Sequence, residues 1–338
     1  MSRSTRTGPG TGPRHRLRRR AALPALPAAL LLALAPPSSA SAAYPDPGRV
    51  TGDVVVHDPS MVRTEDGRYV LYSTHGGLEA RVSTDRTHFT RAGSAFTDLP
   101  DWWSDYSAER DPWAPDISYH KGVYWMYYAV SSFGSNHSAI GLAKSPTGLP
   151  GSWSDRGIVY RTGTGDDHNA IDPSLFVDRD GTWWLSFGSY WTGIKMVRLD
   201  PATGSLHRDR TVHSLATRPD EPYAVEAPQI VKRGNYYYLF VSHDRCCAGT
   251  DSTYKIKVGR STSPTGPYTD RDGVPMPDGG GTTVLATHGR FIGPGGQSVL
   301  KDSDGHVLVH HYYDGADDGT PKLGINLLSW GGGWPTAR

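Results

Sequence analysis

The feature that most restricts the fold of this chain is a unit of similar sequence that occurs five times between residues 57 and 309. Each unit holds a proline, a short apolar run, a turn with Gly, and a second run rich in aromatic and β-branched residues. Proline is tolerated at the first position of a strand, and turns with Gly close β-hairpins. Each unit therefore predicts a hairpin. The five prolines are Pro59, Pro115, Pro173, Pro228 and Pro294.

The prolines are separated by 56, 58, 55 and 66 residues, which leaves room for more strands in every unit. A third strand is indicated at residues 139–143, 194–199, 254–259 and 323–329. Three or four antiparallel strands in a unit of this length are typical of a propeller blade, so the sequence predicts an all-β, five-bladed β-propeller. The alternative is a β-sandwich of unrelated hairpins, which would not repeat one matched unit five times. The repeat does not indicate which strand closes the ring.

The N-terminal segment has the three parts of a secretory signal. Five Arg between residues 14 and 20 precede an apolar run at residues 21–35, and Ala40-Ser41-Ala42 is a small-residue cleavage signal. The apolar run is too short and too interrupted by Pro for a lasting membrane anchor. We expect a signal peptide over residues 1–42, a propeller catalytic domain over residues 43–338, and a secreted, extracellular protein. The alternative is a disordered basic arm, and Arg19-Arg20 leaves the export route open.

Removal of residues 1–42 changes the charge balance. These residues contain seven Arg and no acidic residue, so the remaining chain has 28 basic and 34 acidic residues and a net charge of −6. Such a charge argues against nucleic acid or an anionic membrane as a partner. It suits a neutral polymer. No later apolar stretch is long enough for a transmembrane helix.

Cysteine occurs only at Cys246 and Cys247. Adjacent cysteines cannot join distant parts of a fold, and two are too few to suggest a zinc site. The sequence leaves two states open, a strained vicinal disulfide and a pair of thiols.

Carboxylates occur in three of the five residue pairs that precede the anchoring prolines. The innermost strand of a blade lines the central channel, so these pairs are expected at one mouth of it. Clustered like charges push their pKa values apart, and hydrolysis of a glycosidic bond requires one protonated and one ionised carboxyl group. Asp before Pro also starts turns, but this alternative does not account for the glutamate. The pairs are His57-Asp58, Trp113-Ala114, Ile171-Asp172, Glu226-Ala227 and Ile292-Gly293.

These motifs carry a family resemblance. The chain from about Val54 to Trp334 resembles glycoside hydrolase family 43, whose members are five-bladed propellers that act on arabinan and xylan. Several stretches are similar to the arabinan endo-1,5-α-L-arabinosidases of that family, and they follow one another over nearly the whole chain after residue 43. They are HDPS (57–60), WAPDI (113–117), SSFG (131–134), SAIGLA (138–143), NAIDPSLF (169–176), FGSYW (187–191), EAPQI (226–230), CCAGTDSTY (246–254), GPGGQSV (293–299) and HYYDG (311–315).

The resemblance implies catalytic roles. Asp58 matches the general base, Glu226 the general acid, and Asp172 a third carboxyl that orients Glu226 and tunes its pKa. The family inverts configuration, and in inverting enzymes the two carboxyl groups stand roughly 6.5–9.5 Å apart to admit a water.

The resemblance also implies a metal ion, usually calcium, held near His311 and largely through water. On first principles a lone His is more often a core or surface residue, and calcium prefers oxygen ligands. The adjacent His310 leaves room for the assignment to move by one position. No organic cofactor is expected.

Five further residues are expected to bind substrate because their motifs flank the mouth. Trp113 and Phe133 could stack on a sugar face or pack between blades. Asn169 could bind a sugar hydroxyl or shape a turn. The five residues are His57, Trp113, Phe133, Asn169 and Ser189.

Together these features predict a monomeric, secreted, inverting hydrolase that cuts 1,5-α-L-arabinofuranosidic linkages inside arabinan. Two alternatives remain. An exo-acting α-L-arabinofuranosidase or β-xylosidase would use the same fold with differently shaped loops. A non-catalytic carbohydrate-binding propeller predicts that at least one of the three carboxylates is lost, whereas all three are present.

Overall fold

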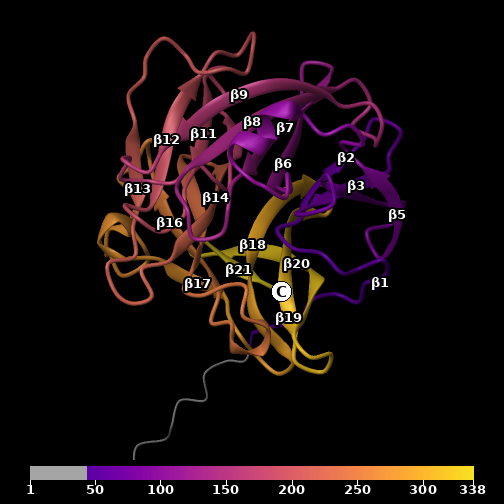
Figure 1. The fold of residues 1–338 in the computed structure, drawn as a ribbon. Helices are drawn as coiled ribbons and strands as arrows, with labels where there is room; N and C mark the ends of the chain where they lie inside the picture. Colours follow the sequence, from indigo (N-terminus) through magenta and orange to yellow (C-terminus); the bar gives the residue numbers. More distant parts are fainter. Residues whose placement is uncertain (1–43) are drawn as a thin grey trace, which may run out of the picture. The chain divides into compact units, whose positions relative to one another are not determined.

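In the computed structural model, which describes residues 44–338, the chain forms five β-sheets that follow one another around a central axis (Figure 1). The predicted five-bladed β-propeller is confirmed. The expected signal peptide at residues 1–42 lies outside the described residues. Among residues 44–338 there is no helix of the length and apolarity that a membrane crossing requires.

Each blade is a meander of four antiparallel strands, numbered from the axis outward. Blade 1 contains β2 (Ser60–Arg63), β3 (Tyr69–Ser73), β4 (Glu79–Ser83) and β5 (His88–Ser94). Blade 2 contains β6 (Pro112–His120), β7 (Val123–Val130), β8 (Ser138–Ser145) and β9 (Ser154–Thr162). Blade 3 contains β10 (Ser174–Val177), β11 (Trp183–Phe187), β12 (Ile194–Leu199) and β13 (His213–Ala216).

Blade 4 contains β14 (Val225–Arg233), β15 (Tyr236–His243), β16 (Lys255–Ser261) and β17 (Thr282–Leu285). Blade 5 contains β18 (Phe291–Asp302), β19 (Gly305–Asp314), β20 (Thr320–Gly331) and β21 (Trp334–Ala337). Three short 3-10 helices lie in the connections: η1 (Asp101–Asp105), η2 (Gly249–Asp251) and η3 (Met276–Asp278). The third strands indicated by the sequence correspond to β8, β12, β16 and β20. The third strand of blade 1, β4, was not predicted from the sequence.

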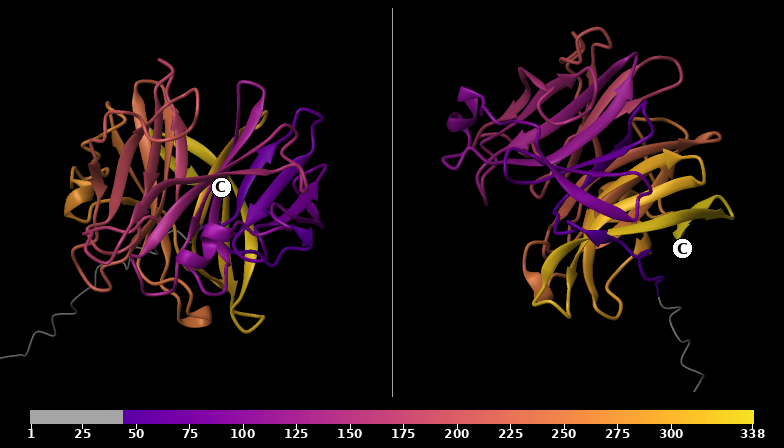
Figure 2. Two further views of the ribbon diagram at one scale, coloured as in Figure 1. Left: turned by 45° about the horizontal axis from the view of Figure 1, so that its top comes forward. Right: turned by 90° about the vertical axis from the view of Figure 1, so that its right-hand side faces the viewer.

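The ring is closed by the N-terminal segment of the described chain. Its short strand β1 (Thr51–Gly52) pairs in parallel with β5 of blade 1. The same segment also bonds to β20 of blade 5, where the Leu323 N–H donates to Val54 O and the Gly48 N–H donates to Ile325 O, both at 2.8 Å. Blade 5 therefore lies beside blade 1, as the yellow and indigo ribbons show in Figure 1 and Figure 2.

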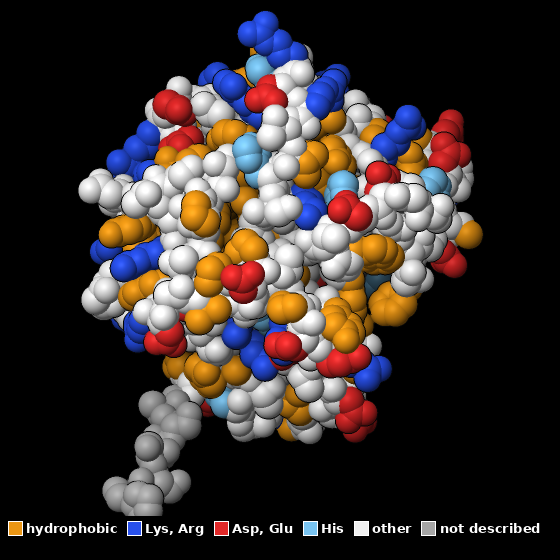
Figure 3. Space-filling model, turned by 90° about the vertical axis from the view of Figure 1, so that its left-hand side faces the viewer, with side chains coloured by type: hydrophobic (Ala, Val, Ile, Leu, Met, Phe, Trp, Pro, Cys, Tyr) orange, Lys and Arg blue, Asp and Glu red, His pale blue; other side chains and the backbone are white. Residues whose placement is uncertain are grey.

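The hydrophobic core is divided into five clusters, one between each pair of neighbouring blades. Both faces of an inner strand are thus covered. Burial of each large apolar side chain contributes about 1.5–3 kcal/mol to the free energy that stabilises the folded state. One pair represents each interface around the ring: Tyr72 and Tyr128, Tyr127 and Phe187, Met196 and Leu239, Phe240 and Leu308, and Leu71 and Val309. This packing fixes the blades against each other and so fixes the ends of the inner strands. On the outer face drawn in Figure 3, Lys and Arg side chains are interspersed with Asp and Glu.

Candidate active site

The residue before each anchoring proline adopts the left-handed backbone conformation. Such a conformation is uncommon for residues other than Gly, although Asp tolerates it better than most. It therefore recurs as a structural feature of the propeller repeat and not as an isolated distortion. The φ angles are 46° at Asp58, 43° at Ala114, 55° at Asp172, 49° at Ala227 and 54° at Gly293.

The three carboxylates lie at one mouth of the channel as expected from the sequence, but they do not occupy one equivalent position in the repeat. Asp58 and Asp172 are the left-handed residues of blades 1 and 3. Glu226 comes one residue earlier in its unit and lies within β14, where it pairs with Ser242 of β15. A residue on a strand and a residue in the turn before it direct their side chains differently. The repeat therefore produces two kinds of carboxylate at the mouth.

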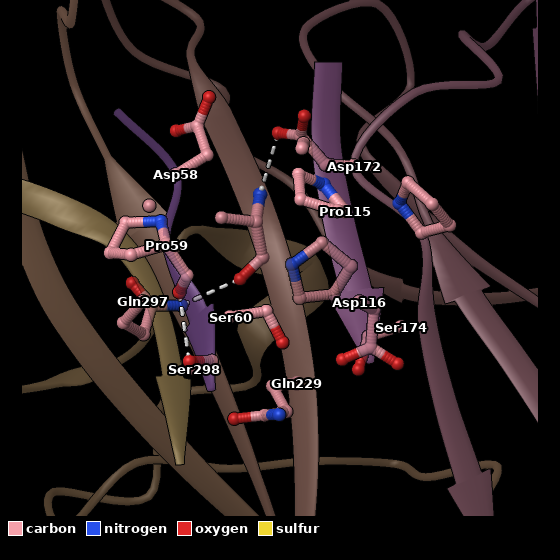
Figure 4. A pocket seen from close by; sticks show the side chains of 15 residues that line it. Asp58, Pro59, Ser60, Pro115, Asp116, Asp172, Ser174, Gln229, Gln297 and Ser298 are labelled. Carbon is pink, nitrogen blue, oxygen red and sulfur yellow. Dashed lines mark hydrogen bonds between the residues drawn. The ribbon is translucent and has the colours of Figure 1, made fainter. Parts of the chain in front are cut away.

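Inside this mouth the inner strands enclose a narrow polar channel of about 30 Å³ (Figure 4). The Gln297 side chain donates to Ala227 O at 2.6 Å, and the Ser298 hydroxyl donates to Pro59 O at 2.8 Å. A space of this size holds about two waters or one ion. Besides Asp58 and Asp172, a further carboxyl group, that of Asp116, lines the channel. Burial raises the pKa of Asp116 to about 7, although a hydrogen bond from the Leu175 N–H acts to lower it.

On the other side of the mouth an open cleft of about 800 Å³ covers the channel entrance. Ligand sites commonly measure about 300–1,000 Å³, so this cleft is at the upper end of the range. The cleft brings together every residue that the sequence analysis selected except His311. They are His57, Asp58, Trp113, Phe133, Asn169, Asp172, Ser189 and Glu226.

Asp58 is surrounded by groups that favour its ionised form. His57 Nδ1 lies 2.7 Å from Oδ2, and the Thr74 hydroxyl donates to the same oxygen at 2.8 Å. Oδ1 faces His311 Nδ1 at 3.5 Å. Burial alone would raise the pKa of Asp58, but the electrostatic attraction and hydrogen bond of His57 and the hydrogen bond from Thr74 outweigh it. The pKa is therefore held well below its usual range, and Asp58 is a carboxylate at neutral pH.

Space beside Asp58 depends on Gly296, which is in the left-handed conformation with φ of 56°. A Cβ at this position would collide with Asp58 Oδ1 and with the His311 ring. A side chain is thus excluded both by the backbone conformation and by the lack of room.

Glu226 is the buried carboxyl group of the set. The Ser189 hydroxyl donates to Oε1, and the Tyr254 hydroxyl donates to Oε2 at 2.6 Å. Burial raises the pKa of Glu226 above its usual value, and these two hydrogen bonds oppose the change without cancelling it. Ser189 lines the cleft as predicted, but its hydroxyl is already bonded to the glutamate.

Asp172 has its pKa raised furthest of the three. Burial is the largest cause, followed by the negative charges of Glu226 and Asp58, and one hydrogen bond from the Ala227 N–H to Oδ2 at 3.0 Å opposes them. The bond joins the carboxyl to the residue that follows Glu226. Asp172 is therefore placed to influence both the charge and the position of Glu226.

The predicted sugar-contacting residues differ in their exposure. The Phe133 side chain is 87% exposed at the rim of the cleft, so it does not pack between blades. Trp113 is half-buried in the cleft lining. Asn169 is buried, and its amide oxygen accepts a hydrogen bond from the Ser138 hydroxyl at 2.6 Å. Phe133 and Trp113 thus retain free aromatic surface for a ligand, whereas Asn169 also supports the loop geometry.

Several residues of the site were missed by the sequence analysis. Thr74 bonds Asp58 from the end of β3, and no local pattern marks it. Tyr254 was part of a recognised motif but received no role. Two aromatic residues that follow Ser189, Tyr190 and Trp191, line the cleft, each with positive φ. These contacts arise because distant turns meet at the mouth of the ring.

The chemistry at His311 fits a metal ion. His57, Asp58 and His311 offer ligand atoms within 4.8 Å of one another. Both nitrogens of His57 have hydrogen bond partners, but His311 Nε2 is buried and has none among the described residues. Burial, with the influence of His57, lowers the pKa of His311 well below its usual value, against the attraction of Asp58. The Asp58 N–H donates to His311 Nδ1 at 3.1 Å, so the neutral ring carries its proton on Nε2, and a metal ion bound there would displace that proton. His310 instead pairs with Asn326 on β20, which leaves His311 as the candidate ligand.

Comparison with known proteins decides the family. The sequence profile described as Glycosyl hydrolases family 43 matches residues 48–335. The chain belongs to glycoside hydrolase family 43. It is therefore a glycoside hydrolase, and the family 43 profile spans all five blades.

Two of the similar proteins are arabinanases from Bacillus species. The chain is 46% identical to the extracellular endo-alpha-(1->5)-L-arabinanase 1 of Bacillus subtilis over 287 residues, which cover 83% of this chain and 87% of that protein. Among solved structures, the endo-arabinanase of Bacillus licheniformis has a TM-score of 0.81 and 49% identity, and covers 85% of this chain and 99% of its own. An exo-1,5-alpha-L-arabinanase from a bovine ruminal metagenomic library has a TM-score of 0.80 and 38% identity, with coverage of 86% and 100%.

Proposed function

We propose that this protein is a secreted, inverting endo-1,5-α-L-arabinanase that hydrolyses arabinan. The observation that carries the proposal is the opposite environment of two carboxyl groups in one open cleft: Asp58 with a lowered pKa and Glu226 with a raised pKa. The family and the names of the similar proteins support the substrate. Export is supported by the pattern of residues 1–42 and by the Bacillus subtilis relative, which is named extracellular.

In the proposed reaction Glu226 is the general acid. Its raised pKa favours the protonated carboxyl, which can donate its proton to the oxygen of the departing sugar. The bond from this oxygen to the anomeric carbon breaks, and the leaving chain departs as an alcohol. Asp172, through its bond to the Ala227 N–H, holds the residue that follows Glu226 and so supports the placement of Glu226.

Asp58 is the general base. Its Oδ2 accepts hydrogen bonds from both His57 and Thr74, which leaves Oδ1 to accept a proton from water. The water oxygen bonds to the anomeric carbon on the face opposite the leaving group, and the configuration inverts. Proton donation and removal together restore neutral products.

The exo mode is the second candidate, since a similar structure is named an exo-1,5-alpha-L-arabinanase. The open cleft of about 800 Å³, bordered by exposed Phe133 and half-exposed Trp191, favours the endo mode. A chain that continues beyond both sides of the cleaved bond requires a groove without a closed end.

Product analysis on linear, debranched arabinan tests the function. We expect a rapid fall in viscosity and a ladder of short oligosaccharides, because cleavage begins inside the chain. Chromatography of the early products is the measurement, with linear xylan as the control substrate. Release of arabinose or one short oligomer from the chain end would replace the endo assignment with the exo one. Cleavage of xylan alone would exclude arabinan as the substrate.

Substitution of the carboxylates tests their roles. Glu226→Gln should lower the rate on arabinan by about 10²–10⁴-fold, the usual contribution of a general acid. It should retain activity on an aryl arabinofuranoside whose leaving group needs no protonation. Asp58→Asn should be inactive on both substrates because no base remains. Glu65→Gln, on an exposed hairpin turn, is the matched control and should behave as the wild type. Equal loss on both substrates in Glu226→Gln would contradict its role as the acid.

The pH profile tests the environment of Glu226. Activity should fall at low pH when Asp58 becomes protonated and at high pH when Glu226 ionises. Tyr254→Phe removes a hydrogen bond that favours the ionised form of Glu226, so the pKa of Glu226 should rise further. The high-pH limb of kcat/KM should then move to higher pH while the low-pH limb stays in place. Tyr236→Phe, on the outer surface, serves as the control. Movement of the limb to lower pH would contradict the assignment.

Calcium at His311 is part of the proposal. His311 Nε2 is the protein group that would hold the ion, with water as the remaining ligands that calcium prefers. When bound, the cation supplies positive charge that favours the ionised form of Asp58.

Removal of the ion provides the test. Chelation should lower the melting temperature, because a ligand at 100-fold excess over its Kd stabilises the folded state by about 2.7 kcal/mol. Calcium should restore it, and elemental analysis should find calcium in the wild type and less in His311→Ala. His310→Ala is the matched control for substitution of a buried His on β19. An ion-free protein with unchanged stability and activity would contradict the calcium proposal.

A further inference from the structure

Cys246 and Cys247 form a disulfide, which settles the two states that the sequence left open. The pair lies in the loop between β15 and β16, and both residues line the cleft that contains the carboxylates. Cys247 is exposed and Cys246 is half-buried, so the bond is accessible from solvent. Nothing in the reaction described above uses this disulfide.

A continuous series of hydrogen bonds leads from the disulfide to Asp58. The Cys247 N–H donates to the Tyr313 hydroxyl at 2.7 Å. Tyr313 lies 2.8 Å from His57 Nε2, and His57 Nδ1 lies 2.7 Å from Asp58 Oδ2. Because an N–H can only donate, Tyr313 accepts from Cys247 and has its own proton left to donate to His57. His57 can then donate from Nδ1 to the carboxylate.

The disulfide acts on the first donor of this series directly. It closes a small ring of covalent bonds, and the peptide between Cys246 and Cys247 is part of that ring. The N–H that Tyr313 accepts belongs to this peptide. Cys247 also has a φ of 60°, in the left-handed region that residues with a Cβ rarely adopt. Within the ring this conformation is retained, whereas in an open dithiol the peptide is free to turn away from Tyr313.

The rest of the loop has its own anchors. The Thr253 N–H donates to Arg245 O at 2.9 Å, and the Ala248 N–H donates to the Ser252 hydroxyl at 3.1 Å. Opening of the disulfide would therefore leave the ends of the loop in place. The change then involves the Cys246–Cys247 peptide, the hydroxyl that it holds, and the Cys247 sulfur, which lies 3.8 Å from His57 Nε2.

We propose that the Cys246–Cys247 disulfide is a positioning element for the general base, acting through Tyr313 and His57, so that hydrolysis depends on the oxidised state of the pair. The inference rests on the proposed function, in which Asp58 is the base. Reduction by a dithiol breaks the S–S bond. The dithiol supplies two electrons and two protons and becomes a disulfide itself, while the enzyme retains two thiols.

The test compares kcat and KM on a linear 1,5-arabino-oligosaccharide for oxidised and reduced enzyme. Because the chain contains only these two cysteines, a reductant has a single target, and thiol titration reports its conversion. Reduction should lower kcat about fivefold to tenfold, the effect of losing one hydrogen bond of ordinary strength. KM should not change, and reoxidation should restore kcat.

Two variants separate positioning from other effects. The Cys246→Ser, Cys247→Ser double variant should have the low kcat of the reduced enzyme and should not respond to the reductant. Tyr313→Phe interrupts the series at its second member. It should also have a low kcat, and reduction should lower it no further. The melting temperature of each form shows that the propeller is intact.

Three results would overturn the inference: an unchanged kcat in the reduced wild type, a further loss on reduction in Tyr313→Phe, or a change confined to KM, which would indicate contact with the sugar. Failure of the proposed function gives a different result. In that case the oxidised wild type itself leaves the oligosaccharide intact.

Discussion

The active site depends on a backbone conformation that is repeated around the ring. Near the start of each inner strand one residue is left-handed and the next is proline, and in blades 2, 4 and 5 both lie within the strand. The left-handed residue turns the chain into the channel wall, and the proline is tolerated there because its nitrogen need not donate a hydrogen bond. Apolar packing between the blades then holds the five turns at fixed positions. Where the left-handed residue is Asp, this arrangement delivers a carboxylate to the mouth.

This arrangement gives the protein two carboxyl groups whose pKa values are shifted in opposite directions. Asp58 and Glu226 both experience burial, which raises the pKa of each. Their neighbours decide the outcome. Asp58 has two His nearby in addition to a hydroxyl, while the two hydroxyl groups around Glu226 only reduce the effect of burial. The difference between the pKa values of Asp58 and Glu226 is therefore created by residues that are brought in from other strands.

The sequence predicts the features that repeat along the chain. It does not predict contacts between residues that only folding brings together. The prolines and Gly turns predict the blades, and the residues before the prolines lead to Asp58, Asp172 and Glu226. The sequence does not reveal what the shift of one residue between Asp172 and Glu226 means, because the direction of each side chain depends on the strand register. Thr74 could not be predicted, since its contact with Asp58 crosses from the end of one strand to the start of another. The hydrogen bond from Cys247 to Tyr313 could not be predicted either, because these two residues are 66 positions apart in the sequence and meet only in the folded chain.

The closure of the ring has a consequence for the order of folding. Asn326 donates to Asp46 O across a sequence separation of 280 residues, and the neighbouring bonds to β20 span a similar distance. Contacts of such long range are slow to form. Strand β20, which pairs with the N-terminal segment, is among the last parts of the chain to leave the ribosome. The N-terminal segment therefore remains unpaired until synthesis is nearly complete. Until then blades 1 and 5 each expose the apolar face that they share in the finished ring. Any agent that shields exposed apolar surface during this interval protects the chain at the step where it is most prone to aggregate.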